Sequence, residues 1–258
     1  MAASQASGGP QTSSIDPKEI KRFDAMAADW WNPRGTMKAL HRLNPLRLRY
    51  IRDRVAEHFA ISSTALDGLR GLSLADIGCG AGLLSEPLAR LGGEVTGVDA
   101  APTNIEMARR HARQAGIAVD YRAMTAEDLL AASDRFDVVL AMEIVEHVTD
   151  RAAFLANCAG LVKPGGLLFV STINRTMKAY ALAIVAAERV LRWVPEGTHD
   201  WDKFVTPDEV TRAVTPVGLV ESHRSGVVYN PLFDEWRLSG DVDVNYMMVF
   251  AKPQLVED

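Results

Sequence analysis

The chain has 258 residues, of which 48% are hydrophobic and 24% are charged, and its formal net charge is −5. This composition is typical of a globular protein with one large core, and the acidic balance argues against a surface that binds nucleic acid phosphates. We therefore expect no nucleic acid partner. The two cysteines, Cys79 and Cys158, are too few for a disulfide framework and favour a reducing compartment.

Residues 1–15 are mostly small and polar, which predicts a disordered tail. They lack the charged start and apolar run of a signal peptide and the arginines of a transit peptide. No uninterrupted apolar run in the chain reaches the roughly 18 residues required to cross a bilayer. We therefore expect a cytoplasmic protein in which residues 16–258 form a single domain.

Residues 16–60 predict a helical cap ahead of the main sheet, with breaks at Pro33 and Pro45. Short apolar runs then alternate with helical stretches, which indicates successive βα units. The expected strands are 72–77, 94–98, 119–122, 136–141 and 167–172, and the expected helices are 83–91, 103–114 and 151–161. A helical insertion (174–203) and two strands (219–228 and 245–251) follow. This order predicts a Rossmann-like α/β fold: a mostly parallel seven-stranded sheet with helices on both faces.

A glycine-rich segment, Asp76–Gly82, follows the first predicted strand and opens a helix, so backbone amides can approach a ligand closely there. Gly78, Gly80 and Gly82 give the spacing G-x-G-x-G, whereas a dinucleotide site has G-x-G-x-x-G. Asp99 ends the second strand, where a carboxylate can accept hydrogen bonds from both ribose hydroxyls. Together these features predict a site for S-adenosylmethionine (SAM). The alternative is a tight turn, with Asp99 capping the next helix.

An acidic and histidine cluster follows the fourth strand, at the sheet edge where ligands of parallel sheets bind. In a helix, Glu143, Glu146 and His147 would share one face. They could hold a magnesium ion, or His147 with Glu146 could act as the general base. Either role would favour the phenolate of a phenol, whose pKa is near 10. A solvated loop with one helix-capping carboxylate is the alternative.

Several blocks of the sequence resemble the ubiquinone biosynthesis O-methyltransferases, a family of class I SAM-dependent methyltransferases. The resemblance runs from about residue 20 to residue 250. The glycine-rich turn belongs to the broad class, whereas its combination with the other blocks is specific to the family. The blocks are His41–Arg47, Asp76–Gly82, Glu143–Val148, Gly197–Asp200 and Asp243–Met247.

The resemblance implies a class I methyltransferase fold, SAM as cofactor, and O-methylation of 2-polyprenyl-6-hydroxyphenol and of 3-demethylubiquinol. It implies SAM binding at Arg47, Gly78, Asp99 and Met142, and the guanidinium of Arg47 suits the methionine carboxylate. Met142 would lie near the adenine, although a core methionine would look the same in the sequence. In mitochondrial relatives the acidic and histidine cluster is associated with magnesium, which extends to this chain as an expectation of Mg²⁺.

A polyprenyl tail resides in lipid, so we expect peripheral contact with anionic lipids at the inner face of the cytoplasmic membrane. The insertion carries apolar side chains together with Arg175, Lys178 and further basic residues, and residues 34–54 contain seven Lys or Arg against one Asp. A helix that covers the sheet or forms a dimer contact would share these features. Trp30 and Trp31 leave a similar choice between an active-site lid, which we favour, and ordinary packing. Other enzymes of ubiquinone biosynthesis are further expected partners.

Three other interpretations compete with this one. A SAM methyltransferase of the same fold could act on another small molecule. A nicotinamide-dependent oxidoreductase is disfavoured by the glycine spacing. A non-catalytic lipid-binding or scaffold protein could keep the fold, but the joint presence of Asp99, Glu146 and His147 argues against it.

Overall fold

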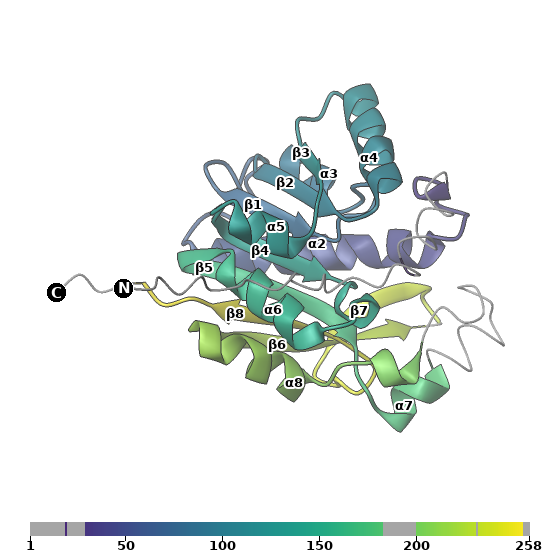
Figure 1. Ribbon diagram of the computed structural model, residues 1–258. Coiled ribbons are helices and arrows are strands. Elements are labelled where there is room, and N and C mark those ends of the chain that lie inside the picture. Colours follow the sequence, from purple (N-terminus) through teal and green to yellow (C-terminus); the bar gives the residue numbers. More distant parts are fainter. Residues whose placement is uncertain (1–18, 20–28, 183–199, 231, 255–258) are drawn as a thin grey trace, which may run out of the picture.

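The structure is a computed structural model that describes residues 19, 29–182, 200–230 and 232–254. The predicted tail, residues 1–15, lies outside the described residues, as do most of the first part of the cap and residues 183–199 of the insertion. The described residues form one mixed sheet with helices on both of its faces (Figure 1).

The sheet has eight strands in the order β3-β2-β1-β4-β5-β8-β6-β7. Strands β1 to β5 are parallel to their neighbours among themselves, whereas β8 pairs antiparallel with β5 and with β6, and β7 pairs antiparallel with β6. The predicted α/β class is therefore confirmed. The bounds are β1 Ser73–Ile77, β2 Glu94–Asp99, β3 Asp120–Ala123, β4 Phe136–Met142, β5 Val162–Ile173, β6 Val220–Asn230, β7 Glu235–Ser239 and β8 Asn245–Ala251.

The eighth strand is a correction to the seven that the sequence predicts. Strand β7 forms a hairpin with β6, with Asn230 opposite Glu235, and lies at the edge of the sheet. It is only five residues long and none of its residues is buried. A strand that buries no side chain leaves no hydrophobic pattern in the sequence, so it was missed.

The helices have the bounds α2 Lys38–His58, α3 Ser85–Arg90, α4 Pro102–Ala115, α5 Ala126–Ala131, α6 Arg151–Gly160, α7 Met177–Ala179 and α8 Pro207–Val214, and the 3-10 helices are η2 Val145–His147, η4 Trp201–Lys203 and η5 Thr215–Val217. Helix α2 continues through Pro45, so the predicted break there is wrong. Proline removes one helical hydrogen bond, but the helix buries Leu43, Leu46, Tyr50 and Ile51 on either side of it, and this burial outweighs the loss.

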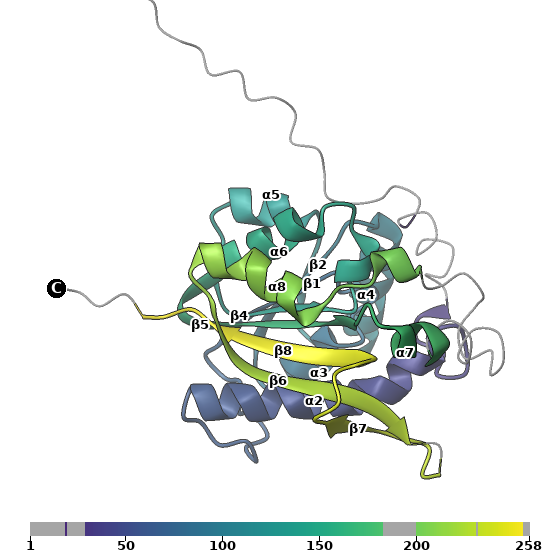
Figure 2. The same ribbon diagram turned by 90° about the horizontal axis from the view of Figure 1, so that it is seen from below.

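Two layers of helices cover the sheet (Figure 2). Helices α5, α6 and α8 lie on one face, where Leu129, Leu155 and Val210 join a single apolar cluster with the strands. Helices α2 and α3 cover the other face with Ile51 and Leu88. Burial of both faces holds the sheet in place, so the carboxyl ends of β1, β2 and β4 have defined positions from which the loops start.

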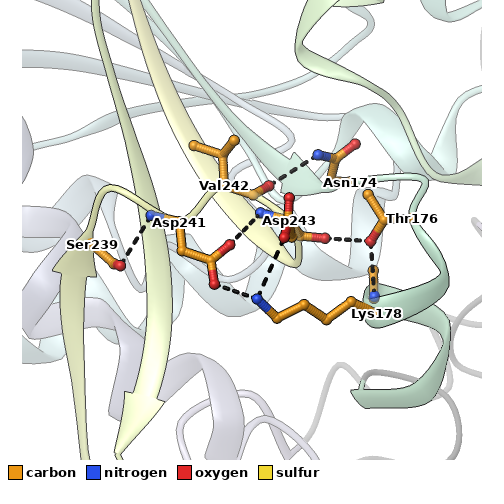
Figure 3. Close-up of polar contacts among 8 residues, drawn as sticks. Asn174, Thr176, Lys178, Ser239, Asp241, Val242 and Asp243 are labelled. Atoms are coloured by element: carbon orange, nitrogen blue, oxygen red, sulfur yellow. Dashed lines mark hydrogen bonds and ion pairs between the residues drawn. The ribbon is translucent and has the colours of Figure 1, made fainter.

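The first residues of the insertion form polar contacts with the loop between β7 and β8 (Figure 3). The Thr176 hydroxyl accepts the Ala179 N–H at the start of α7 and donates to the Asp243 carbonyl. The Lys178 ammonium pairs with the carboxylates of Asp241 and Asp243. The first residues of the predicted insertion are thus fixed beside the carboxyl end of β5.

Candidate active site

The glycine-rich turn leaves β1 in a conformation that glycine adopts most easily. Gly78 and Gly80 have φ values of 73° and 55°, in the left-handed region. A side chain on either residue would also collide with a neighbour: a Cβ on Gly78 would lie 2.6 Å from Ile144, and one on Gly80 would lie 2.3 Å from the Trp30 ring. The absence of a side chain at these two positions therefore lets Ile144 and Trp30 pack directly on the backbone of the turn.

Asp99 ends β2 beside this turn and organises it. Its Oδ2 accepts the Gly80 N–H at 2.9 Å, and its Oδ1 accepts the Ala101 N–H at 2.8 Å. Asn104 in the first turn of α4 donates its amide to the same Oδ1 at 3.3 Å. The carboxylate thus joins the glycine-rich turn to the residues that begin α4, although α4 has no side-chain capping bond at its N-cap, Ala101.

Arg47 comes from the middle of α2 and is only 4% exposed. Its Nη2 donates to Asn44 Oδ1 at 2.9 Å, and Asn44 in turn donates to the Leu83 carbonyl after the glycine-rich turn. Burial lowers the pKa of Arg47, while the negative charges of Glu143 and Asp76 oppose that shift. A buried guanidinium beside the turn has the charge and the donors that a carboxylate ligand requires.

Three buried polar atoms near these residues lack a hydrogen-bond partner within the described part of the chain. They are Arg47 Nε, Asn104 Oδ1 and Asn245 Oδ1. Buried polar groups are nearly always hydrogen-bonded, so such atoms are candidates for a bond to a ligand or to a water molecule. A donor at Arg47 suits a carboxylate, and an acceptor at Asn104 beside Asp99 suits a ribose hydroxyl or an adenine amine. The residues present therefore fit SAM.

The segment after β4 is not the α-helix that the acidic and histidine cluster required. Glu143 has a φ of 56°, and only Val145–His147 form a 3-10 turn. The Glu143 carboxylate accepts the Ser171 hydroxyl at 2.7 Å, whereas the Glu146 carboxylate accepts the Thr172 hydroxyl at 2.7 Å. Burial raises the pKa of Glu146. The three side chains therefore do not share a helical face.

This arrangement does not fit a magnesium ion. Among the described residues, no group of three or more His, Cys, Asp and Glu side chains is placed to hold a metal. Both carboxylates already accept hydrogen bonds from hydroxyls of β5, and the ring of His147 faces Glu19, with Nδ1 3.3 Å from Oε2. The carboxyl end of β4 is thus followed by a half-buried imidazole that faces Glu19.

The two tryptophans of the cap lie over the glycine-rich turn. Trp30 is 7% exposed and packs on Gly80, and Trp31 donates its indole N–H to the Ala81 carbonyl at 3.1 Å. The Trp31 ring stacks on His111 of α4, with centroids 3.4 Å apart, and His111 faces the carboxylate of Glu86 at 2.8 Å. The two tryptophans therefore cover the turn, as both the lid and the packing interpretation require.

The structure also places near the site residues that sequence reasoning missed. Ser171 and Thr172 end β5 and hold the two carboxylates, and Asn245 at the start of β8 lies opposite the end of β5 and donates toward Glu143 at 3.5 Å. The predicted cofactor residue Met142 is the last residue of β4 and is 6% exposed. Ser and Thr at a strand end carry no distinctive spacing, so only the fold could identify them.

Comparison with known proteins agrees with this geometry. Residues 75–170 match the family described as "Methyltransferase domain". The solved magnesium protoporphyrin IX methyltransferase of Synechocystis, determined with bound SAM, has a TM-score of 0.58 and 17% identity and covers 94% of this chain and 100% of its own. A SAM-dependent methyltransferase from Clostridium acetobutylicum has a TM-score of 0.60 and 11% identity, over 90% and 98% of the two chains. These likenesses confirm the predicted class I methyltransferase fold.

Curated relatives are much more similar. A ubiquinone biosynthesis O-methyltransferase of Methylobacterium nodulans is 56% identical over 240 residues, which are 93% of this chain and 96% of that protein. The protein of the same name from a Chelativorans species is 55% identical over 93% and 95% of the two chains. Identity at this level over nearly the full length shows the family. This chain belongs to the ubiquinone biosynthesis O-methyltransferases.

Proposed function

We propose that this chain transfers a methyl group from SAM to the catechol-like hydroxyl of 2-polyprenyl-6-hydroxyphenol and of 3-demethylubiquinol. The observation that carries this proposal is the identity of 55% to a ubiquinone biosynthesis O-methyltransferase over 93% of the chain. The geometry supports it, because the proposed SAM site (Arg47, the glycine-rich turn and Asp99) and the candidate base His147 lie at the same end of the parallel strands. A methyltransferase for another small molecule would share the SAM site, so the acceptor requires its own test.

For the donor, we assign Arg47 to the methionine carboxylate, Asp99 to the ribose hydroxyls, and the backbone of Gly78 and Gly80 to close contact with the nucleoside. When bound, SAM supplies a methyl group on a positively charged sulfur. The chain's own task is alignment: Met142 and the covering Trp30 exclude water from the reacting atoms. Arg47 is held rigidly by Asn44, so it can orient the donor without moving.

For the acceptor, we assign His147 as the general base and Glu146 as the buried carboxylate beside it. The phenolic proton passes to the imidazole, the electron pair left on oxygen forms the new C–O bond while the S–C bond breaks, and the imidazolium later gives its proton to water. The proposed proton transfer uses His147 and has no step through Mg²⁺, because among the described residues no group of three or more His, Cys, Asp and Glu side chains is placed to hold a metal.

The test is transfer of labelled methyl from SAM to a short-tailed demethylubiquinol and, in parallel, to a polyprenyl catechol, with magnesium or with chelator. We expect transfer to both acceptors and no loss with chelator. Loss with chelator would restore the predicted metal role of Glu143, Glu146 and His147. If SAM binds but neither acceptor is methylated, the substrate assignment is wrong while the methyltransferase class stands.

We further propose that the chain contacts the membrane peripherally through α7 and the residues that follow it. No helix among the described residues is long and apolar enough to cross a membrane. Met177 and Leu182 are 72% and 49% exposed, which suits shallow contact with lipid. Sedimentation with phosphatidylglycerol vesicles tests this proposal: Met177→Ser with Leu182→Ser should weaken binding, and unchanged binding would contradict it. The expected assembly with other enzymes of ubiquinone biosynthesis, and residence at the inner face of the cytoplasmic membrane, remain predictions.

A further inference from the structure

Glu19 lies between two side chains from distant parts of the chain. Its Oε2 is 3.3 Å from His147 Nδ1, and its Oε1 accepts the Lys203 ammonium at 3.0 Å. The side chain of Glu19 is only 13% exposed and that of His147 15%. The contact with His147, reinforced by Lys203 and opposed by partial burial, lowers the pKa of Glu19 to about 2. Glu19 is therefore an ionised carboxylate directed at one ring nitrogen of the proposed base.

The choice of nitrogen has a chemical consequence. A neutral imidazole carries its proton on one nitrogen and accepts a proton on the other. A carboxylate beside Nδ1 stabilises the tautomer that is protonated at Nδ1, because only a donor at that atom is attracted to it. Nε2 then carries the lone pair. In the same way, the aspartate of a Ser-His-Asp triad fixes the ring of its histidine.

We propose that Glu19 is a positioning residue for His147: its carboxylate holds the imidazole in the tautomer that is protonated at Nδ1 and leaves Nε2 to accept the proton of the acceptor hydroxyl. This inference rests on the proposed role of His147 as the base. It assigns to the amino-terminal cap a second contribution besides the tryptophans that lie over the glycine-rich turn. Lys203 holds the other carboxylate oxygen.

A structural alternative would use the same contacts. Glu19 could simply tie the cap to η4, where Lys203 lies, without affecting the imidazole. A purely structural contact between Glu19 and Lys203 would affect the stability of the protein, and the effect of losing it would be the same whichever residue occupies position 147. A positioning residue, in contrast, affects the rate constant of methyl transfer only while His147 is present. The two roles therefore differ in a double-mutant cycle.

The experiment measures kcat, the KM of the demethylubiquinol acceptor, the Kd of SAM and the Tm for Glu19→Gln, His147→Ala and the double variant. A general base raises the rate about 10²- to 10⁴-fold, and a misoriented base retains part of that factor. We therefore expect Glu19→Gln to lower kcat about 10- to 100-fold. The KM and the Kd should stay within about twofold. In the His147→Ala background, Glu19→Gln should cause no further loss.

Two more variants separate the roles. Glu19→Asp keeps the charge and should recover part of kcat, whereas Lys203→Met breaks the tie to η4 and should lower kcat by about threefold at most. Equal losses from Glu19→Gln with and without His147, or full activity of Glu19→Gln beside an impaired His147→Ala, would overturn this inference alone. Full activity of His147→Ala would overturn the proposed base as well.

Discussion

Replacing Arg47 by methionine should raise the stability of the ligand-free protein. The guanidinium is 4% exposed, and within the described part of the chain it donates to Asn44 while its Nε has no partner. A buried polar group without a partner costs about 1–3 kcal/mol, and the lost bond to Asn44 contributes about 1 kcal/mol. Burial also outweighs the attraction of Glu143 and Asp76 in its effect on the pKa of Arg47. We therefore expect the free energy of unfolding to rise by about 1 kcal/mol, or the Tm by about 2–4 °C.

The same substitution should weaken the binding of SAM. A charge-assisted pair between guanidinium and carboxylate contributes about 1.5–3 kcal/mol. Its loss corresponds to a Kd that is about 10- to 150-fold higher. Opposite signs for stability and binding are expected where a residue is retained for its ligand rather than for the fold.

Calorimetry measures both quantities: thermal unfolding of the ligand-free protein and titration with SAM. Arg49→Met is a matched control, because Arg49 lies on the same helix and is exposed. Arg49→Met should change the Tm by no more than about 1 °C. It should leave the Kd of SAM unchanged. If Arg47→Met lowers the Tm and leaves the Kd of SAM unchanged, Arg47 acts as an ionic partner of Asp76 and Glu143, and its assignment to the methionine carboxylate is wrong.

Three further substitutions test the proposed SAM site and the segment that covers it. Asp99→Ala should raise the Kd of SAM at least about tenfold, and an unchanged Kd in calorimetric titration would remove the ribose assignment. Trp31→Ala removes the stack on His111, so stopped-flow measurement should show SAM leaving several-fold faster; a lower Tm with an unchanged dissociation rate would assign Trp31 to packing alone. Gly82→Ala places a Cβ 2.0 Å from the Tyr121 hydroxyl at a φ of 89°, and should lower the free energy of unfolding by about 2 kcal/mol or more. Tyr121→Phe should restore only part of that loss in urea titrations, because the backbone strain stays.

The proximity of the glycine-rich turn and Asp99, to which we assign SAM, was predictable because both lie at the carboxyl ends of neighbouring strands. Strands β1 and β2 are parallel neighbours with Ile77 opposite Val98, so the turn after one strand and the carboxylate that ends the other must meet. The alternation of apolar runs and helical stretches likewise predicted the five parallel strands, although not their order in the sheet. The weakly patterned elements were missed: α5 and α8 are short, and β7 buries none of its residues.

The acceptor half was less predictable, because it depends on backbone conformation and on distant contacts. Nothing in the sequence indicates that Glu143 adopts a positive φ, which few non-glycine residues do. In an α-helix, Glu143, Glu146 and His147 would share one face. The 3-10 turn that the segment forms instead separates the three side chains. Glu19 belongs to a segment with no motif of its own, so its approach to His147 could emerge only from the fold.

The seven basic residues between positions 34 and 54 show why a count of charges does not define a surface. Arg47 is buried against the site, and Arg42 pairs with Asp234. In the insertion, Arg175 pairs with Glu209, and Lys178 is held by Asp241 and Asp243. Much of the positive charge that suggested anionic lipid is therefore already compensated by acidic side chains of the same chain. Membrane contact through α7 should consequently depend more on its exposed apolar side chains than on charge, and vesicle binding should weaken little as salt increases.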